Sequence, residues 1–369
     1  KQKYRGLYCI GCEEFKPEKD LIDGRCAEHS NSKPEILEEE NYFFRLSNNA
    51  KKLDDLISSD VLKIIPESRK NEALSFIRAG LHDFSISRTR ERTKNWGIEV
   101  PGDAGQMMYV WVDALSNYIN ALGYASDSKN FNDYWIDAEK IIHVIGKGIN
   151  RFHTIYWPAL LLSVGVRIPT TIFVHGYITV AGKKMSKSLG NVIDPFEFAK
   201  KFGVDAVRYY LLREIPAYED GDVSESRFLE RYNADLSNGL GNFASRVTTL
   251  AEKLGKFNFD AGDIEKEVGA IIAKTKENVG EKITQFKFNE ALALIWEFLS
   301  FGDRYVNEKK PWVDLNKRTI ANLVAILDNI AVLIQPFIPE TAAKITASIS
   351  WISESQLEVK KIPALFPRL

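Results

Sequence analysis

Two lysines in a short basic segment have the charge and spacing to act on phosphates. The segment is KKMSKS, residues 183–188, in which Lys184 and Lys187 are three residues apart among serines and are followed by Gly190. Ammonium groups and hydroxyls in one loop can bind a triphosphate and stabilise the negative charge that develops on it. The alternative is an ordinary solvated basic loop, which a KxxK pattern alone does not exclude.

A second group of residues is typical of a ligand pocket. KIIHVIG, residues 140–146, has the pattern of a buried strand that ends at Gly146. Ile149, His153 and Trp157 follow at every fourth position, so they should share one face of a helix. The glycine would let a phosphate approach the backbone closely. The alternative for the stripe is ordinary core packing.

All three cysteines lie within the first thirty residues, which favours a metal site over disulfides. The pattern CIGC followed by CAEH supplies Cys9, Cys12, Cys26 and His29. Two close ligand pairs can hold zinc tetrahedrally, and four protein ligands leave no open position for catalysis, which predicts a structural Zn²⁺. The alternative is a pair of buried thiols together with a surface histidine that occurs there by chance.

A fourth group lies in the predicted helical part of the chain, between residues 242 and 312. Asn242 and Arg246 are four residues apart in LSNGLGNFASR, on one face of a predicted helix, and Trp312 follows Pro311 at a predicted helix boundary. These side chains could simply cap and pack helices.

The elements that must position these residues fall into distinct parts. A chain of 369 residues suggests two or three packed units. From about residue 86, β-rich stretches such as MMYVWVDA, KIIHVIG and TTIFVHGYITV alternate with helical ones, which indicates a parallel α/β sheet. From about residue 226, apolar residues recur at helical spacing, which predicts a helical bundle.

Composition narrows the class of protein. The 45% hydrophobic and 27% charged residues are those of a soluble globular protein, and no apolar run approaches the roughly 20 residues that span a bilayer. We therefore expect no membrane role and a cytoplasmic location. The net charge of -1 gives no global attraction for a polyanion, so any nucleic-acid binding would depend on local clusters.

Taken together, the motifs resemble those of the methionyl-tRNA synthetase family of class I aminoacyl-tRNA synthetases. KKMSKS, its flanks FVHGYITV and LGNVIDPFEFAKKFGVDAVRYYLL, and HVIGKGINRFHTIYWPALL carry the resemblance. It implies an α/β fold: the second half of a Rossmann-type parallel sheet, a zinc-knuckle insertion, and a C-terminal α-helical anticodon-binding bundle. The implied domains are 1–85 for the connective-peptide insertion (zinc part about 1–35), 86–170 for the half Rossmann domain, 171–225 for the KMSKS-bearing stem-contact region and 226–369 for the bundle.

The resemblance also implies roles for individual positions. The implied methionine-binding residues are Trp111, Ala114, Leu115, Tyr118, Ile149, His153 and Trp157. The implied ATP-binding residues are Gly146, Gly148, His175, Gly176, Ile178, Lys184 and Lys187. The implied anticodon-binding residues are Asn242, Arg246 and Trp312, since Trp can stack on an unpaired base while Asn and Arg hydrogen-bond to its edge. One position departs from the family: Gly148 stands where an aspartate usually meets the ribose.

The implied reaction joins methionine to ATP as methionyl-adenylate and then to tRNA(Met). Lys184 and Lys187 would act electrostatically on the triphosphate as the catalytic residues, with Mg²⁺ assisting. The family also carries an HIGH-type motif, and no HxGH occurs in these 369 residues. We therefore expect the missing N-terminal catalytic segment to be needed, for instance as a separate chain, and the isolated chain to form no methionyl-adenylate.

Two other functions are compatible with parts of this pattern. One is another class I synthetase, such as the leucyl, isoleucyl, valyl or cysteinyl enzymes, which share the KMSKS loop. No large editing insertion separates the cysteine-rich part from the α/β strands, which disfavours the first three. The other is a noncatalytic tRNA-binding remnant, which predicts decay of the pocket and of the KMSKS loop, whereas both patterns are intact.

Overall fold

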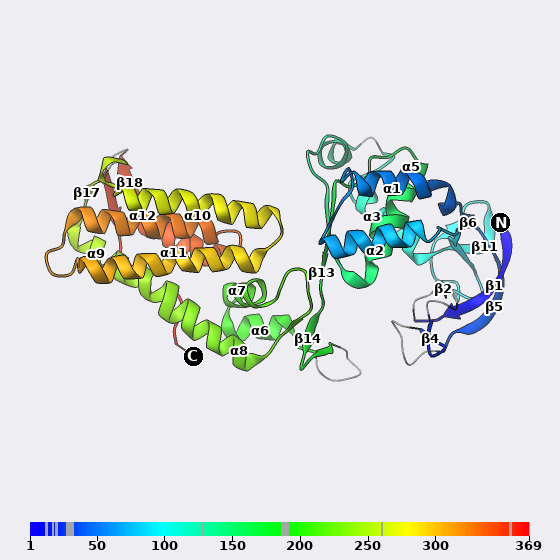
Figure 1. Ribbon diagram of the computed structural model, residues 1–369, viewed down its shortest axis with the longest axis horizontal. Coiled ribbons are helices and arrows are strands. Elements are labelled where there is room, and N and C mark those ends of the chain that lie inside the picture. Colours follow the sequence, from blue (N-terminus) through cyan, green and yellow to red (C-terminus); the bar gives the residue numbers. More distant parts are fainter. Residues whose placement is uncertain are drawn as a thin grey trace. The chain divides into compact units, whose positions relative to one another are not determined.

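The computed structural model describes residues 1–11, 14–16, 18, 21–26, 33–126, 128–185, 192–259, 261–353 and 356–368. Two compact units make up the chain, Lys1–Val174 and His175–Leu369 (Figure 1).

The first unit begins with small antiparallel sheets. One sheet has the order β2-β1-β5 and another the order β10-β11-β9, while β3 pairs with β4 and β6 pairs with β8. The bounds are β1 Gln2–Cys9, β2 Glu14–Lys16, β3 Leu21–Ile22, β4 Arg25–Cys26, β5 Glu35–Asn41, β6 Phe43–Phe44, β8 Phe84–Ser85, β9 Ser87–Thr89, β10 Glu99–Val100 and β11 Asp103–Met108.

A three-stranded sheet of order β12-β13-β7 forms the rest of this unit. β13 pairs in parallel with β7, with Ile172 beside Ile64. The strands are β7 Lys63–Ile65, β12 Ile142–Gly146 and β13 Thr171–His175. The helical segments are η2 Leu46–Asn49, α1 Ala50–Ser58, α2 Glu67–Arg78, α3 Val110–Asn120, α4 Lys129–Phe131, η3 Asn132–Ile136, η4 Lys147–Ile149, η5 Phe152–Tyr156 and α5 Trp157–Ser163. Parallel strands with helices between them confirm the predicted α/β character.

The core of the first unit joins sheet and helices in one apolar cluster. Ile64 and Ile172 from the strands, Ile57 from α1 and Leu115 from α3 are all fully or almost fully buried in it. Each such side chain contributes about 1.5–3 kcal/mol relative to an exposed one. This packing fixes α3 against the sheet and so places its inward residues.

One stretch differs from its predicted structure. MMYVWVDA was predicted as a strand, but β11 ends at Met108 and α3 begins at Val110. Aromatic and β-branched residues favour strands only weakly, and burial of one helix face overrides that preference here. Trp111, Leu115 and Tyr118 consequently fall on one side of a helix.

The second unit starts with a small sheet of order β15-β14-β16 and continues as helices. The strands are β14 Ile178–Val180, β15 Lys183–Lys184 and β16 Gly221–Asp222. The helices are α6 Pro195–Phe202, α7 Val204–Glu214, α8 Glu225–Arg231, η7 Tyr232–Gly241, α9 Asn242–Leu254, η8 Ala261–Asp263, α10 Lys266–Thr284, α11 Phe288–Lys309, α12 Lys317–Ile334 and α13 Pro339–Ser348. A further sheet, β17-β19-β18, is formed by β17 Phe257–Asn258, β18 Ile349–Ser353 and β19 Gln356–Val359.

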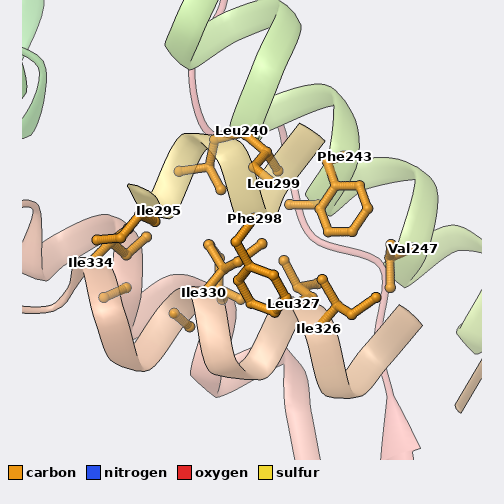
Figure 2. Packing of buried hydrophobic residues seen from close by; sticks show 14 of the residues in the cluster. Leu240, Phe243, Val247, Ile295, Phe298, Leu299, Ile326, Leu327, Ile330 and Ile334 are labelled. Atoms are coloured by element: carbon orange, nitrogen blue, oxygen red, sulfur yellow. The ribbon is translucent and has the colours of Figure 1, made fainter. Parts of the chain in front are cut away.

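The helices of this unit pack around one hydrophobic core. Figure 2 shows side chains of η7, α9, α11 and α12 pointing toward one another, among them Phe243, Phe298 and Leu327, all of which are buried. Gly302 permits a close approach of α11, since a Cβ there would lie 2.6 Å from Cζ of Phe243. Asn316 caps α12 by accepting the backbone N–H of Thr319 at 3.0 Å. The predicted helical bundle is confirmed, with a small sheet that its pattern did not predict.

Candidate functional site

Aromatic and imidazole rings from α3, η3, β12 and the helix after β12 gather in the first unit. We call the set Tyr118, Trp135, His143, His153 and Trp157 the aromatic cluster. The ring centroids of Tyr118 and His143 are 4.1 Å apart in an edge-to-face arrangement. The ring centroid of His143 lies 6.0 Å from the ring centroids of both Trp135 and His153. Such geometry suits aromatic packing and leaves polar atoms on the ring edges.

His153 is held at both ring nitrogens. Its side chain is 1% exposed, Nδ1 lies 3.0 Å from the carbonyl oxygen of Ile149, and Nε2 lies 2.9 Å from the hydroxyl of Tyr118. A carbonyl can only accept, so Nδ1 carries the proton and donates, and the Tyr118 hydroxyl donates to Nε2. Burial lowers the pKa of His153, which keeps the ring neutral.

The helix that carries His153 is wide at this point. η5 is a π-helix, and Pro158 occupies the second position of α5. Proline lacks the N–H that a regular turn would use, and π turns of this kind are frequent at functional sites. The predicted stripe of Ile149, His153 and Trp157 does lie on one continuous helical segment, with His153 and Trp157 buried and Ile149 half-buried.

His143 is a member of the cluster that sequence reasoning did not single out. Its side chain is 5% exposed, and among the described residues Nε2 has no hydrogen-bond partner. Burial, with a smaller contribution from His153, lowers the pKa of His143 to about 4. Alternation along KIIHVIG placed His143 and Ile145 on the inner face of β12, which was the available signal.

The other predicted methionine-binding residues surround this cluster unevenly. Trp111 stacks on Phe152, with centroids 4.0 Å apart and an interplanar angle of 14°. Trp111 also lies 6.4 Å from His153 in an edge-on arrangement. Leu115 is buried in the core of the first unit, whereas its neighbour on α3, Ala114, is exposed. The structure thus brings Trp111, Tyr118, His153 and Trp157 together. The side chain of Ala114 instead faces solvent.

The predicted phosphate-side glycines of the first unit lie where β12 ends and η4 begins. Gly146 ends the strand in an extended conformation and Lys147 opens the short 3₁₀-helix η4. Gly148 is exposed in that turn. A strand that leads into a helix start, with small residues at the junction, is a suitable arrangement for an anion.

In the second unit His175, Gly176 and Ile178 lie at and beyond the end of β13. His175 donates from Nδ1 to the carbonyl oxygen of Gly176 at 2.7 Å, because a carbonyl can only accept. Any Cβ at Gly176 would overlap the carbonyl group of Glu219, so only glycine fits here. Ile178 is partly exposed at the start of β14.

Asp222 holds the hairpin that leads into KKMSKS. In this hairpin β14 pairs with β15, with Thr179 beside Lys184. Asp222 Oδ1 accepts the Thr179 hydroxyl at 2.8 Å and the Gly182 N–H at 2.9 Å. These two hydrogen bonds lower the pKa of Asp222, and the bond from Gly182 has the larger effect. The side chain of Lys184 and all of Lys187 lie outside the described residues. Asp222 was missed, because a contact across some forty residues leaves no local signal.

Two of the four predicted zinc ligands are described. Cys9 ends β1 and Cys26 ends β4, and both are buried. Cys12 and His29 lie outside the described residues, and within those that are described no group of three or more His, Cys, Asp or Glu side chains is placed to hold a metal ion. The two buried thiols are two of the three sulfur ligands of the predicted Cys₃His set, and thiolate sulfur is a ligand that zinc prefers.

Two of the predicted bundle residues, Arg246 and Trp312, lie together with two residues that were not predicted, Asp303 and Asn307. We call these four residues the Arg246 cluster. Arg246 Nη2 donates to Asn307 Oδ1 at 2.8 Å, and Nη1 lies 3.5 Å from Asp303 Oδ1. The guanidinium carbon lies 5.9 Å from the ring centre of Trp312, which is 49% exposed. Asn242 is exposed at the start of α9, one turn before Arg246.

Family comparisons match almost the whole chain. Residues 1–248 match the family model described as tRNA synthetases class I (M). The chain belongs to this family. Residues 265–363 match the model described as anticodon-binding domain of tRNA ligase. Within the described residues, no helix combines the length and apolar character that a membrane crossing needs.

Individual synthetases of this family resemble the chain along its full length. It is 40% identical to the methionine--tRNA ligases of Caldanaerobacter subterraneus subsp. tengcongensis and Clostridium acetobutylicum, covering 100% of this chain and 61% and 60% of those proteins. The structure of Mycobacterium tuberculosis methionyl-tRNA synthetase bound by methionyl-adenylate matches with a TM-score of 0.87 and 35% identity, over 99% of this chain and 77% of that one. The chain therefore spans about three-fifths of the curated relatives' length.

Proposed function

We propose that the chain is the larger part of a methionine--tRNA ligase, which activates methionine with ATP and transfers it to tRNA(Met). The observation that carries the proposal is the hydrogen bond from Tyr118 to His153 inside the aromatic cluster, beside the Trp111–Phe152 stack. Both family matches and the names of the relatives support the reaction class.

The aromatic cluster suits a thioether side chain. Sulfur in methionine is polarizable and interacts favourably with ring edges, and Trp111, Tyr118 and Trp157 supply such edges. The neutral His153 ring, whose proton sits on Nδ1, keeps the Tyr118 hydroxyl oriented. A branched aliphatic side chain of similar size lacks the sulfur contact, so the pocket would favour methionine over leucine.

Activation of methionine requires alignment and neutralisation of charge. The methionine carboxylate attacks the α-phosphorus of ATP, and pyrophosphate leaves. A hydroxyl of the terminal ribose of tRNA then attacks the carbonyl carbon of methionyl-adenylate, and AMP leaves. Gly146 and Gly148 would admit the nucleotide beside β12, and Lys184 and Lys187 would stabilise the charge of the triphosphate. Bound Mg²⁺ would add electrostatic neutralisation of the phosphates. In the second unit Asp222 accepts hydrogen bonds within the β14–β15 hairpin, and β15 contains Lys184.

The remaining parts of the proposal concern tRNA, metal and organisation. Asn242, Arg246 and Trp312 would read the anticodon, and Cys9, Cys12, Cys26 and His29 would bind a structural Zn²⁺. The domain boundaries after residues 85, 170 and 225 stay predictions, as does the cytoplasmic location. Because no HxGH occurs in the 369 residues, we expect adenylate formation to require a segment that carries this motif.

The test is methionine-dependent ATP/pyrophosphate exchange with the chain and a separately produced HxGH-bearing N-terminal segment of a relative. We expect exchange with methionine, little with leucine, and none from the chain alone. His153→Ala should raise the KM for methionine at least about tenfold, because it removes the partner that orients Tyr118. Ser163→Ala, an exposed change on α5, is the control and should leave KM unchanged. Equal exchange with leucine, or an unchanged KM in His153→Ala, would contradict the proposed pocket.

A further inference from the structure

The guanidinium of Arg246 is fixed from one side by helix α11. Asp303 and Asn307 are four residues apart on that helix, so their side chains point from the same face. Asn307 accepts from Nη2 at 2.8 Å and Asp303 lies 3.5 Å from Nη1, which means that both terminal nitrogens are engaged by one helix. Two contacts on two nitrogens define the plane of a guanidinium, whereas one contact would let it rotate.

The same guanidinium also lies close to an exposed aromatic ring, since its carbon is 5.9 Å from the ring centre of Trp312. Trp312 is about half exposed, and Asn242, one turn before Arg246 on α9, is exposed. Arginine has five N–H donors, and the contacts with Asp303 and Asn307 use one on each terminal nitrogen. Other N–H groups of Arg246 therefore remain to donate to the edge of a base that stacks on the indole of Trp312.

Partial burial of the charged Asp303 carboxylate is unfavourable, and its interaction with Arg246 offsets part of that penalty. Burial raises the pKa of Asp303, and Arg246 opposes that shift. A half-buried carboxylate at an RNA-facing surface should also repel the phosphate backbone. Simple attraction of RNA would therefore be served better by a neutral side chain at this position, which makes orientation of Arg246 the role that its geometry supports.

We propose that Asn307 and Asp303 are positioning residues that hold Arg246 in its base-reading orientation, and that they set anticodon specificity without contacting the RNA. This inference rests on the proposed function of the bundle. It adds two residues of α11 to the recognition of an unpaired base, through a contact with α9 that the structure supplies.

The experiment measures tRNA affinity of the 369-residue chain by fluorescence anisotropy. Labelled tRNA(Met) is compared with the same tRNA carrying one altered anticodon base. We define the specificity ratio as the affinity for tRNA(Met) divided by the affinity for the altered tRNA. Asn307→Ala should weaken binding of tRNA(Met) about tenfold and change binding of the altered tRNA little, so this ratio falls. Asn307→Asp keeps an oxygen acceptor for Nη2 and should recover most of the ratio.

Two further variants separate positioning from electrostatics. Asp303→Asn removes a negative charge, so electrostatics alone predicts tighter binding of both tRNAs, whereas positioning predicts a lower ratio. Glu297→Gln removes the same charge from an exposed position of α11 and is the matched control, with the ratio unchanged. In a chain that already carries Arg246→Ala, Asn307→Ala should cause no further loss of affinity for tRNA(Met), because Asn307 acts through the arginine.

The outcomes separate this inference from the proposed function. If the unaltered chain binds both tRNAs equally, the proposed anticodon role fails, and the inference with it. If the unaltered chain discriminates but Asn307→Ala and Asp303→Asn keep the full ratio, only the inference fails. Additive losses from Asn307→Ala and Arg246→Ala would also overturn it. Circular dichroism checks folding, and the exposed position of Asn307 makes a loss of the core unexpected.

Discussion

Replacing His143 with leucine should reduce the amount by which the free energy of unfolding of the first unit falls at acidic pH. In the folded chain burial lowers the pKa of His143 to about 4. In the unfolded chain an ordinary histidine titrates near pKa 6.5. Below about pH 6.5 the unfolded state therefore binds a proton that the folded state does not, so the free energy of unfolding falls as pH falls.

The magnitude follows from the size of this difference. A shift from 6.5 to about 4 corresponds to about 3 kcal/mol of stability, present above about pH 6.5 and lost by about pH 4. Leucine has no proton to bind, so His143→Leu should keep that part of its stability at low pH. Near neutral pH the substitution should have a small effect, since it replaces a buried group whose Nε2 has no hydrogen-bond partner among the described residues.

Urea unfolding followed by tryptophan fluorescence between pH 4.5 and 7.5 measures this difference. Two transitions are fitted, because the chain has two compact units. The quantity of interest is the change in free energy of unfolding with pH, compared between the natural chain and His143→Leu, so that all other titrating groups cancel. Ile145→Val, a truncation of a buried residue on the same strand, should lower stability at every pH without altering the slope. Parallel pH profiles for His143→Leu and the natural chain would refute the reasoning.

Three more predictions rest on single contacts. Tyr118→Phe leaves Nε2 of the buried His153 without its donor and should lower the free energy of unfolding by about 1–3 kcal/mol in urea titrations; no loss would contradict the hydrogen bond. Asp222→Ala removes the acceptor for the Gly182 N–H, so mass spectrometry should show faster hydrogen exchange in the β14–β15 hairpin, and an unchanged rate would contradict the anchor. Gly302→Ala would place a Cβ 2.6 Å from Phe243 and should destabilise the bundle by about 1–3 kcal/mol, seen as a lower thermal midpoint of the second unit.

Local periodicity predicted elements that carry the aromatic cluster. KIIHVIG is the strand β12, and the spacing of Ile149, His153 and Trp157 does place them on one helical segment. Period and burial are local properties, so a single sequence contains them. The π turn at η5 was not predictable, because the spacing of apolar residues does not distinguish a π turn from a regular helical turn.

Contacts between distant segments could not be predicted from the sequence. Asp222 holds a hairpin some forty residues earlier in the chain, and Asn307 holds Arg246 across two helices. The sheet of β17, β18 and β19 also joins segments about a hundred residues apart, so the helical pattern around them concealed it. Such pairings depend on the tertiary fold, and polar residues in loops and on helix surfaces carry no periodic signal of them.

Formation of methionyl-tRNA is the most direct test of the central claim. The chain, supplied with an HxGH-bearing N-terminal segment of a relative, ATP, Mg²⁺, tRNA(Met) and a mixture of amino acids, is assayed by mass spectrometry of the aminoacyl group released from the tRNA. The account predicts methionine on tRNA(Met), and no charging when the segment is left out. Another amino acid on the tRNA, or tight tRNA binding without charging when the segment is present, would contradict it.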